Sequence, residues 1–261
     1  MKQSRLKITD KIGNLDSFLR AKELRFQDEP FRHAIIDDFF PEQIYDRLCE
    51  EFDKKLTHGL SEKYSKDCFY RQGHYDAYAW ILDPEFSEYW NFFYSFEWYS
   101  FLKNSFQLPI LTNTRVALHH HKSFGASGTI HNDYNLTNFV LEPLENGVNP
   151  WFHQCIYMRA RVTHPRVQHN CRSIAVLYYL ANSKNWAPTD GGETGLYQDP
   201  LVNDNPVIKI APLNNRLVVF EVSPLSYHCY LRNGPTPRNV LAQWFHVLER
   251  DAILLYGKEP T

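Results

Sequence analysis

From Thr114 onward, the sequence is a series of short runs of β-branched and aromatic residues separated by clusters of Gly, Pro and Asn. The runs are TRVALHHH, TIHNDYNLTNFVL, SIAVLYYLA, ETGLYQ, VIKI, RLVVFEV and NVLAQWFHVL. Short strands at close intervals, with no helical segment between them, indicate an antiparallel barrel or sandwich. This pattern is the strongest constraint on the fold, and it predicts a double-sheet jelly roll over residues 114–250.

The preceding part of the chain predicts mainly helices. Apolar residues recur at helical spacing over 14–25 and over 41–56, and Pro41 is well placed to begin the second helix. A third helix is expected over 84–104, where aromatic residues are dense enough to be buried on most sides. Between the first two helices, the run FRHAIIDDFF predicts a strand.

The sequence contains no internal repeat, low-complexity tract or clear linker. We therefore expect one mainly β, α+β domain over residues 1–261, in which a helical support region (1–113) packs against one face of the jelly-roll barrel.

Composition excludes several classes of protein. The 28 Lys and Arg residues against 30 Asp and Glu give a net charge of −2, which supplies no field to hold a nucleic acid. The longest apolar stretch, Ile174 to Ala181, is far shorter than the roughly 20 residues of a membrane span. Five cysteines without a CxxC pair, behind an N-terminus with no apolar signal region, predict reduced thiols in a cytoplasmic protein.

The triplet His131-Asn132-Asp133 is the first candidate for a metal site. In an extended strand, residues i and i+2 project to the same side, so an imidazole and a carboxylate can converge on one point. A third ligand must come from a later histidine. The candidates are His153, His164, His169, His228 and His246, and His228 is preferred because Arg238 follows it by ten residues. That spacing allows a turn and a return strand that places a guanidinium close to the metal.

Two histidines and one carboxylate on one octahedral face leave three coordination positions open, as in non-haem Fe(II) oxygenases. A bidentate 2-oxo acid would fill two of them and dioxygen the third. The far carboxylate of 2-oxoglutarate would be buried and would need a planar, permanently charged partner, which Arg238 provides.

Residues from about 115 to 248 resemble the Fe(II)/2-oxoglutarate-dependent dioxygenase superfamily, specifically its prolyl-hydroxylase-like branch. The similar stretches occur in the order of that branch: HND at 131–133, RSIAVLYYLAN at 172–182 with Trp186 following, GGETGLY at 191–197, IAPLNNRLVVF at 210–220, and His228 with Arg238 and Trp244.

The resemblance implies a double-stranded β-helix in which His131, Asp133 and His228 hold Fe(II). It further implies that Arg238 binds the C5 carboxylate of 2-oxoglutarate, that Tyr179 helps to hold this carboxylate, and that O2 is the oxidant.

Two departures from the branch affect the expected site. His121 stands ten residues before His131, where many relatives have a tyrosine, and it is the best candidate among the three consecutive histidines for a contact with the cosubstrate. A long stretch separates Asp133 from Arg172, and residues 142–170 within it predict an insertion that acts as a lid. Trp151 in this insertion and Trp244 are candidates for substrate contact.

The function expected from these residues is the hydroxylation of an unactivated C–H bond of an amino acid or other small metabolite, with release of succinate and CO2. One alternative is a hydroxylase of a protein or peptide residue such as proline. A second is a jelly-roll protein that binds a metal or ligand without turnover. No nucleic-acid or membrane partner is expected, and the oligomeric state stays open.

Overall fold

The structure is a computed structural model, and it describes residues 13–73, 76–83, 86–112, 114–140, 155–156 and 167–261. A large sheet contains β1 (His33–Ile36), β2 (Leu60–Ser61), β3 (Phe69–Arg71), β4 (Tyr78–Ile81), β5 (Thr114–His121), β6 (Leu136–Val140), β7 (Cys155–Ile156), β8 (Val167–Tyr179), β11 (Arg216–Glu221) and β13 (Arg238–Leu248). A small sheet contains β9 (Thr194–Leu196), β10 (Ile208–Ile210) and β12 (His228–Tyr230).

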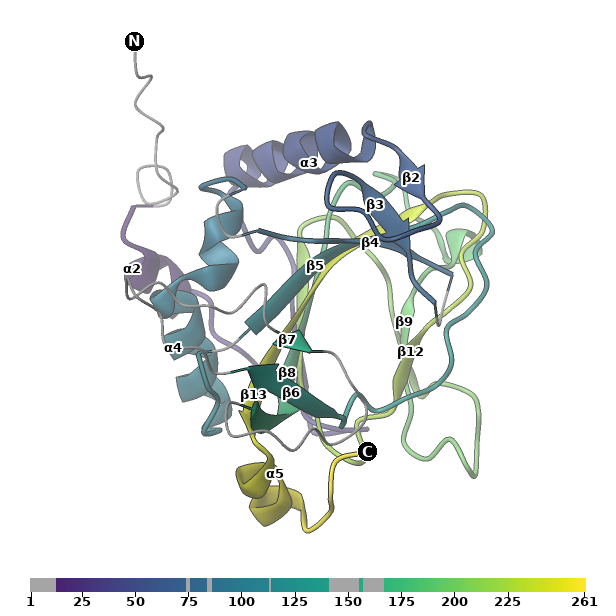
Figure 1. The fold of residues 1–261 in the computed structure, drawn as a ribbon. Coiled ribbons are helices and arrows are strands. Elements are labelled where there is room, and N and C mark those ends of the chain that lie inside the picture. Colours follow the sequence, from purple (N-terminus) through teal and green to yellow (C-terminus); the bar gives the residue numbers. More distant parts are fainter. Residues whose placement is uncertain (1–12, 74–75, 84–85, 113, 141–154, 157–166) are drawn as a thin grey trace.

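The two sheets form the opposite walls of the barrel (Figure 1). The large sheet has the order β1-β11-β8-β13-β5-β4-β3-β2, with β6 paired to β8 and β7 paired to β6, and the small sheet has the order β10-β9-β12. All described pairs are antiparallel except β2 with β3. The predicted α+β jelly roll is confirmed, and all seven of the β-rich runs from residue 114 contribute a strand.

The helices are α2 (Leu15–Arg20), α3 (Glu42–Leu56), α4 (Phe96–Phe106) and α5 (Glu249–Tyr256), with 3-10 turns at Trp90–Tyr94 and Pro188–Asp190. Helices α2 and α4 lie against the outer face of the large sheet, and α3 runs along one end of the barrel (Figure 1). The buried residues of α3 recur at the predicted spacing and share one hydrophobic core with the strands. The helical support predicted for the sheet is therefore present.

The single helix predicted over 84–104 is wrong. Ser95 is extended (φ −70°, ψ 148°) and separates the 3-10 turn from α4. Its hydroxyl accepts a hydrogen bond from Trp98 N at 3.2 Å and so caps α4. A serine that bonds to the backbone three residues ahead begins a helix, and the break follows from that competition.

The first third of the chain also contributes more strand than predicted. The predicted strand at 31–40 is β1, which pairs with β11, while β4 pairs with β5 and carries β3 and β2 at the far edge. These edge strands are two to four residues long, too short for a clear period-2 pattern in the sequence.

The expected insertion at 142–170 lies mostly outside the described residues, so its role as a lid stays a prediction. Its last four residues are not an insertion, because Val167–Asn170 begin β8 and pair with Thr137–Val140 of β6. Cys155–Ile156 pair with β6 as well. The strands on either side of the undescribed segments, β6, β7 and β8, are therefore paired with one another in the large sheet.

Three adjacent strands present one face to the barrel interior. The pairing of β13 with β5 and β8 aligns residues in rows: Arg238 with His121, Val240 with His119 and Tyr179, Ala242 with Ala117 and Leu177, and Trp244 with Arg115 and Ala175. Because side chains alternate along a strand, all these residues point to the same side. We call this set of rows the inner face.

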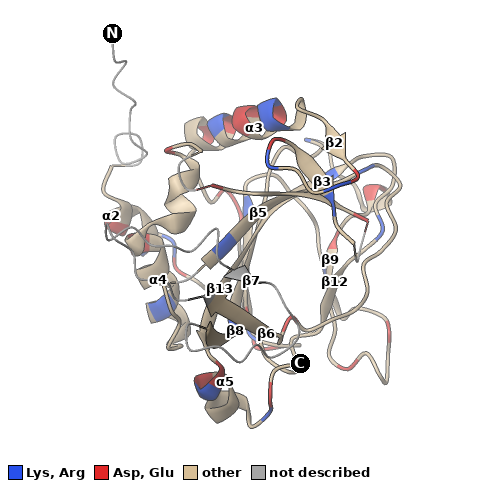
Figure 2. Cartoon of the chain, in the orientation of Figure 1, with Lys and Arg blue, Asp and Glu red and all other residues tan. Residues whose placement is uncertain are grey.

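Charged residues gather on the outer helices and the loops, while the strands are mostly uncharged (Figure 2). Cys49, Cys68, Cys171 and Cys229 are free thiols, as predicted. Among the described residues, none of the helices has the length and apolar character that a membrane span requires.

The fully buried Gln243 joins the helices to the barrel. Its amide nitrogen donates to Phe93 O at 2.6 Å and to Thr114 Oγ1 at 2.8 Å, and its carbonyl accepts from Trp98 Nε1 at 2.9 Å.

We predict that Gln243→Leu lowers the free energy of unfolding by about 2–4 kcal/mol, because it leaves a buried N–H and a buried carbonyl without partners. Urea denaturation followed by circular dichroism measures the change. Trp98→Phe removes only one of the bonds and should cost less. Equal stability of Gln243→Leu and the parent protein would contradict the role assigned to this network.

Candidate active site

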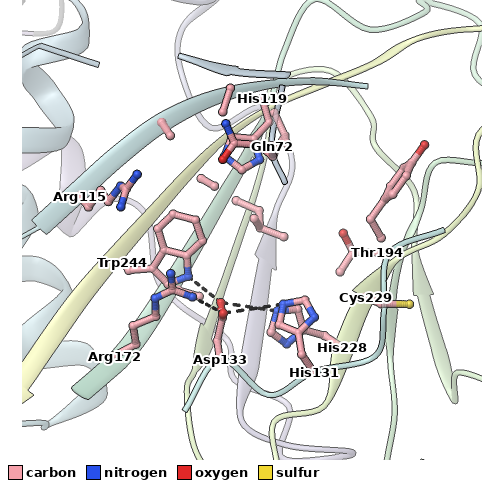
Figure 3. A pocket seen from close by; sticks show the side chains of 18 of the residues that line it. Gln72, Arg115, His119, His131, Asp133, Arg172, Thr194, His228, Cys229 and Trp244 are labelled. Carbon is pink, nitrogen blue, oxygen red and sulfur yellow. Dashed lines mark hydrogen bonds and ion pairs between the residues drawn. The ribbon is translucent and has the colours of Figure 1, made fainter. Parts of the chain in front are cut away.

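Two histidines and a carboxylate converge at one end of the barrel interior. Their donor atoms in His131, Asp133 and His228 all lie within 4.8 Å of one another (Figure 3). Asp133 Oδ1 lies 3.7 Å from His131 Nε2, and Oδ2 lies 3.8 Å from His228 Nε2. The structure thus brings together the three residues that the sequence selected as a metal site.

The backbone achieves this in a different way from the one expected. His131 and His228 face each other across an isolated bridge, through His131 N to His228 O at 3.1 Å and His228 N to His131 O at 2.8 Å. Asp133 has a left-handed backbone (φ 59°) and does not continue an extended strand. Aspartate tolerates this conformation better than most residues, and the turn directs its carboxylate toward the histidines.

Both histidines present Nε2 to the cluster. Nδ1 of His131 donates to Thr129 O at 2.8 Å, and Nδ1 of His228 donates to Ser226 O at 2.8 Å. Burial and, next, the neighbouring His131 lower the pKa of His228 to about 4. His228 is therefore neutral at pH 7, with an Nε2 lone pair available to a metal ion.

The Asp133 carboxylate is buried but compensated. Arg172 forms an ion pair with Oδ1, and the indole N–H of Trp244 donates to Oδ2 at 2.7 Å. Burial alone would raise the pKa of this carboxyl, but the charges of Arg172 and the two histidines, together with the Trp244 hydrogen bond, lower it below its usual value. Asp133 is ionised at neutral pH and is held in a fixed orientation.

A buried arginine lies on the same inner face. Arg238 donates to His121 Nε2 and Thr194 Oγ1, both at 3.1 Å, and to the Tyr179 hydroxyl at 3.4 Å. His121 can accept because its Nδ1 donates to Asp76 O at 3.1 Å. All three acceptors are uncharged, and the buried Nε of Arg238 has no hydrogen-bond partner among the described residues. A buried guanidinium in this state requires an anion.

A tight turn beside Arg238 explains the Gly191-Gly192 pair. Both residues have positive φ (63° and 79°), and Gly191 bridges to Asn233. A Cβ on Gly191 would clash with Arg232 O. Glycine is therefore required at Gly191, where the turn approaches the backbone of the next hairpin.

A cavity of about 570 Å³ connects these groups. Its lining includes the metal-site residues, Arg238 and the inner-face alanines. Polar or charged residues from further elements complete it: Gln72, Arg115, His119, Thr137, Arg172 and Thr194.

A comparison with protein families matches residues 118–246, about half of the chain, to the 2OG-Fe(II) oxygenase superfamily. The chain belongs to this superfamily. It is therefore a dioxygenase that uses Fe(II), 2-oxoglutarate and O2. A comparison with curated protein sequences found no match.

Solved structures of prolyl hydroxylases are similar to this oxygenase in fold. A prolyl-4-hydroxylase from Pseudomonas putida has a TM-score of 0.55 at 15% identity, over 88% of this chain and 97% of that chain. A Trichoplax adhaerens prolyl hydroxylase, in complex with a hypoxia inducible factor peptide fragment, has a TM-score of 0.53 at 16% identity, over 85% of this chain and 86% of that chain. The 2OG complex of the viral collagen prolyl hydroxylase from Paramecium Bursaria Chlorella virus-1 has a TM-score of 0.52 at 15% identity, over 83% of this chain and 96% of that chain.

The donor sets of this oxygenase match its cofactors. Two imidazoles and one ionised carboxylate are ligands that suit Fe(II). The buried Arg238, with uncharged neighbours and an unpartnered Nε, suits one carboxylate of 2-oxoglutarate.

The other sequence candidates fall into three groups. Tyr179 and His121 contact Arg238, and Trp244 lines the cavity. Trp151 lies outside the described residues, as do His153 and His164. The remaining alternative ligands lie elsewhere, since His169 bonds to Asn138 and His246 packs on Phe139.

Sequence analysis did not assign a role to Arg172 or Thr194. Arg172 begins the segment recognised as RSIAVLYYLAN, but its contact with Asp133 depends on how β8 lies beside the turn after His131. An arginine just before the buried apolar run Ile174–Tyr179 was the available signal, because such a residue needs a buried anion.

We predict that Trp244→Phe lowers Fe(II) affinity about 10–100-fold, because it removes the N–H that orients Asp133 but keeps most of the ring. Metal titration under anaerobic conditions measures the affinity. Trp80→Phe, which removes a tryptophan N–H bond to Lys66 O, is the matched control and should bind Fe(II) normally. Unchanged affinity in Trp244→Phe would remove any role for the indole in the metal site.

The cavity also makes a pH-dependent contribution to stability through His119. Burial, followed by the charges of Arg238 and Arg115, lowers the pKa of His119 to about 3. The unfolded state, with a histidine pKa near 6.5, binds a proton between these values while the folded state does not. This contribution is complete above about pH 6.5 and is lost as the pH falls toward 3.

The contribution of His119 makes the free energy of unfolding fall between pH 7 and pH 5. We therefore predict that this fall is about 1–2 kcal/mol smaller in His119→Gln than in the parent protein. Urea denaturation of the metal-free protein at the two pH values measures it. His58→Gln changes an exposed histidine and should keep the parent's pH dependence. A His119→Gln profile parallel to that of the parent would show that His119 does not carry this linkage.

Proposed function

We propose that this oxygenase hydroxylates a residue of a protein or peptide, such as proline. In this proposal His131, Asp133 and His228 hold Fe(II), and Arg238 binds the C5 carboxylate of 2-oxoglutarate. The observation that carries the proposal is a buried guanidinium, surrounded by uncharged acceptors, in the same cavity as the three metal donors.

The chain's own residues position the reactants. Trp244 and Arg172 fix the Asp133 carboxylate, while Thr194, Tyr179 and His121 fix the guanidinium of Arg238. When bound, Fe(II) and 2-oxoglutarate supply the oxidation of a C–H bond by O2, with succinate and CO2 as products. Burial of Arg238 excludes water from the C5 carboxylate of the cosubstrate.

Two observations bear on the substrate. The similar folds of three prolyl hydroxylases, one of them with a bound peptide fragment, favour a peptide residue over the small metabolite that the sequence suggested. A free amino acid is the second candidate, because a cavity of about 570 Å³ is within the size range of small-molecule sites.

We further propose that residues 1–261 act as one catalytic unit. Buried residues of α2, α3 and α4 belong to the same hydrophobic core as β8, β11 and β13.

The function is tested by succinate formation from 2-oxoglutarate with Fe(II), with and without proline-containing peptides and free amino acids. Peptide-stimulated succinate together with a peptide mass gain of one oxygen supports the proposal. Stimulation by free amino acids alone would favour the second candidate. Conversion that is independent of iron would overturn the proposed metal site.

We predict that Arg238→Gln weakens 2-oxoglutarate binding by about 2–5 kcal/mol, since it leaves a desolvated carboxylate unpaired. Fe(II) affinity should change little. Calorimetry with the metal-loaded protein under anaerobic conditions measures both constants. Arg232→Gln alters an exposed arginine of the preceding turn and is the control. A similar loss in both variants would place the cosubstrate elsewhere.

A further inference from the structure

Two uncharged polar side chains follow Asp133 along the wall of the cavity. Asn135 and Thr137 both line the cavity that contains the metal donors, Asn135 just before β6 and Thr137 within it. Alternate residues of an extended chain point to the same side and are roughly 6.6 Å apart along it. The Asn135 amide and the Thr137 hydroxyl can each donate a hydrogen bond without carrying a charge. The wall beside the candidate metal site therefore presents two neutral donors in a row.

The described residues leave both donors unused. The Asn135 amide carbonyl accepts a hydrogen bond from Thr261 Oγ1 at 3.1 Å, but none of the described residues accepts one from Asn135 Nδ2. The Thr137 hydroxyl likewise has no hydrogen-bond partner among the described residues, although Thr137 is only 3% exposed. A buried donor that bonds to nothing costs free energy. Both groups are therefore available to a molecule in the cavity.

The segment after α5 holds Asn135 in this orientation. The chain returns from α5 to the end of the barrel (Figure 1), where Thr261 N donates to Tyr134 O at 3.1 Å and Leu136 N donates to Thr261 O at 3.0 Å. The Tyr134 hydroxyl also donates to Lys258 O at 2.8 Å. Because the two backbone bonds flank Asn135, the Thr261 hydroxyl is fixed against the Asn135 carbonyl. The amide nitrogen of Asn135 is left for another partner.

The spacing of the two donors fits an extended peptide. In an extended chain, the carbonyl groups of alternate residues point to the same side and repeat every two residues, again at roughly 6.6 Å. Donors with the same repeat can therefore bond to two alternate carbonyls of one peptide that lies along the start of β6. Neutral donors suit backbone carbonyls, which carry no charge. A free amino acid has a single carbonyl-containing group and can use only one of the donors.

We propose that Asn135 and Thr137 bind the substrate by donating hydrogen bonds to two alternate backbone carbonyls of an extended peptide. Thr261 is a positioning residue in this site, since it acts through the Asn135 amide. The inference rests on the proposed function, and it names the residues by which that function would select a peptide over a free amino acid.

The test measures peptide and amino-acid binding in matched variants. The probes are N-acetyl-Ala-Pro-Ala amide and L-proline, together with the corresponding peptides and free amino acids built on lysine and on leucine. Calorimetry measures their binding to the full chain loaded with Zn(II) and 2-oxoglutarate, in which no turnover occurs because zinc has no redox chemistry. The affinities for Zn(II) and 2-oxoglutarate are measured in the same variants.

We expect Asn135→Leu and Thr137→Val each to weaken binding of the tightest peptide probe about tenfold, because each variant removes one donor and keeps much of the side-chain volume. Thr137→Ser retains the hydroxyl and should bind the peptide as the parent does. A free amino acid should respond to at most one of the two substitutions. Thr57→Val, at the exposed end of α3, is the control and should change nothing. The affinities for Zn(II) and 2-oxoglutarate should stay the same throughout, which a merely structural defect would not allow.

The positioning role of Thr261 has its own readout. Thr261→Val should weaken peptide binding about threefold, and Thr261→Ser should restore it, because serine keeps the hydroxyl. In the Asn135→Leu background, Thr261→Val should cause no further loss, since the group that it orients is already absent. An equal loss in both backgrounds would overturn the positioning role.

Peptide binding that is the same in Asn135→Leu, Thr137→Val and the parent would overturn the inference, as would a parent protein that binds none of the probes. Neither result decides the proposed function, which is tested separately by iron-dependent succinate formation. Conversely, peptide binding that depends on both residues, without peptide-stimulated succinate, would retain the peptide site and overturn the hydroxylase proposal.

Discussion

The buried carboxylate of Asp133 is the group on which the rest of the site depends. A charge removed from water is costly unless it is paired and hydrogen-bonded, and here Arg172 and the Trp244 indole do both. These partners come from β8 and β13, which are adjacent strands of the large sheet. The sheet therefore has to form correctly before the carboxylate can be held between His131 and His228. The geometry of the candidate metal site therefore depends on the pairing of β8 with β13.

The same reasoning applies at the other end of the inner face. Arg238 is as deeply buried as Asp133, but its hydrogen-bond partners are a neutral imidazole and two hydroxyls. Burial and the adjacent guanidinium keep the pKa of His121 well below its usual value, so this histidine stays an acceptor. The protein thus compensates the charge of Asp133 within its own structure, whereas the described residues offer Arg238 only uncharged partners, as the proposed cosubstrate site requires. This difference distinguishes a structural ion pair from a binding site.

The sequence predicted the parts of this arrangement that depend on local pattern. The β-rich runs from residue 114 predicted the strands of the barrel, and Arg238, ten residues after His228, singled out His228 among the later histidines. It failed where a single residue departs from the local rule. Ser95 ends a helical pattern by bonding to the backbone of Trp98, and the left-handed Asp133 ends an extended one. The Ser95 hydroxyl competes for a backbone group, and the Asp133 carboxylate bonds to Arg172 and Trp244 on other strands; hydrophobic periodicity registers neither effect.

The contacts of Arg172 could not be predicted from the sequence either, but the reason is different. Its partner Asp133 lies on the far side of a long stretch of chain, and only the pairing of β6 with β8 brings the two together. The spacing of residues in the sequence does not show that the chain returns to place β8 beside β6. The sequence does indicate one chemical requirement: an arginine just before the apolar run Ile174–Tyr179 must pair with an anion once β8 is buried. Reading buried charges as pairs that must be completed would have linked Arg172 to Asp133 and left Arg238 without an anionic partner among the described residues.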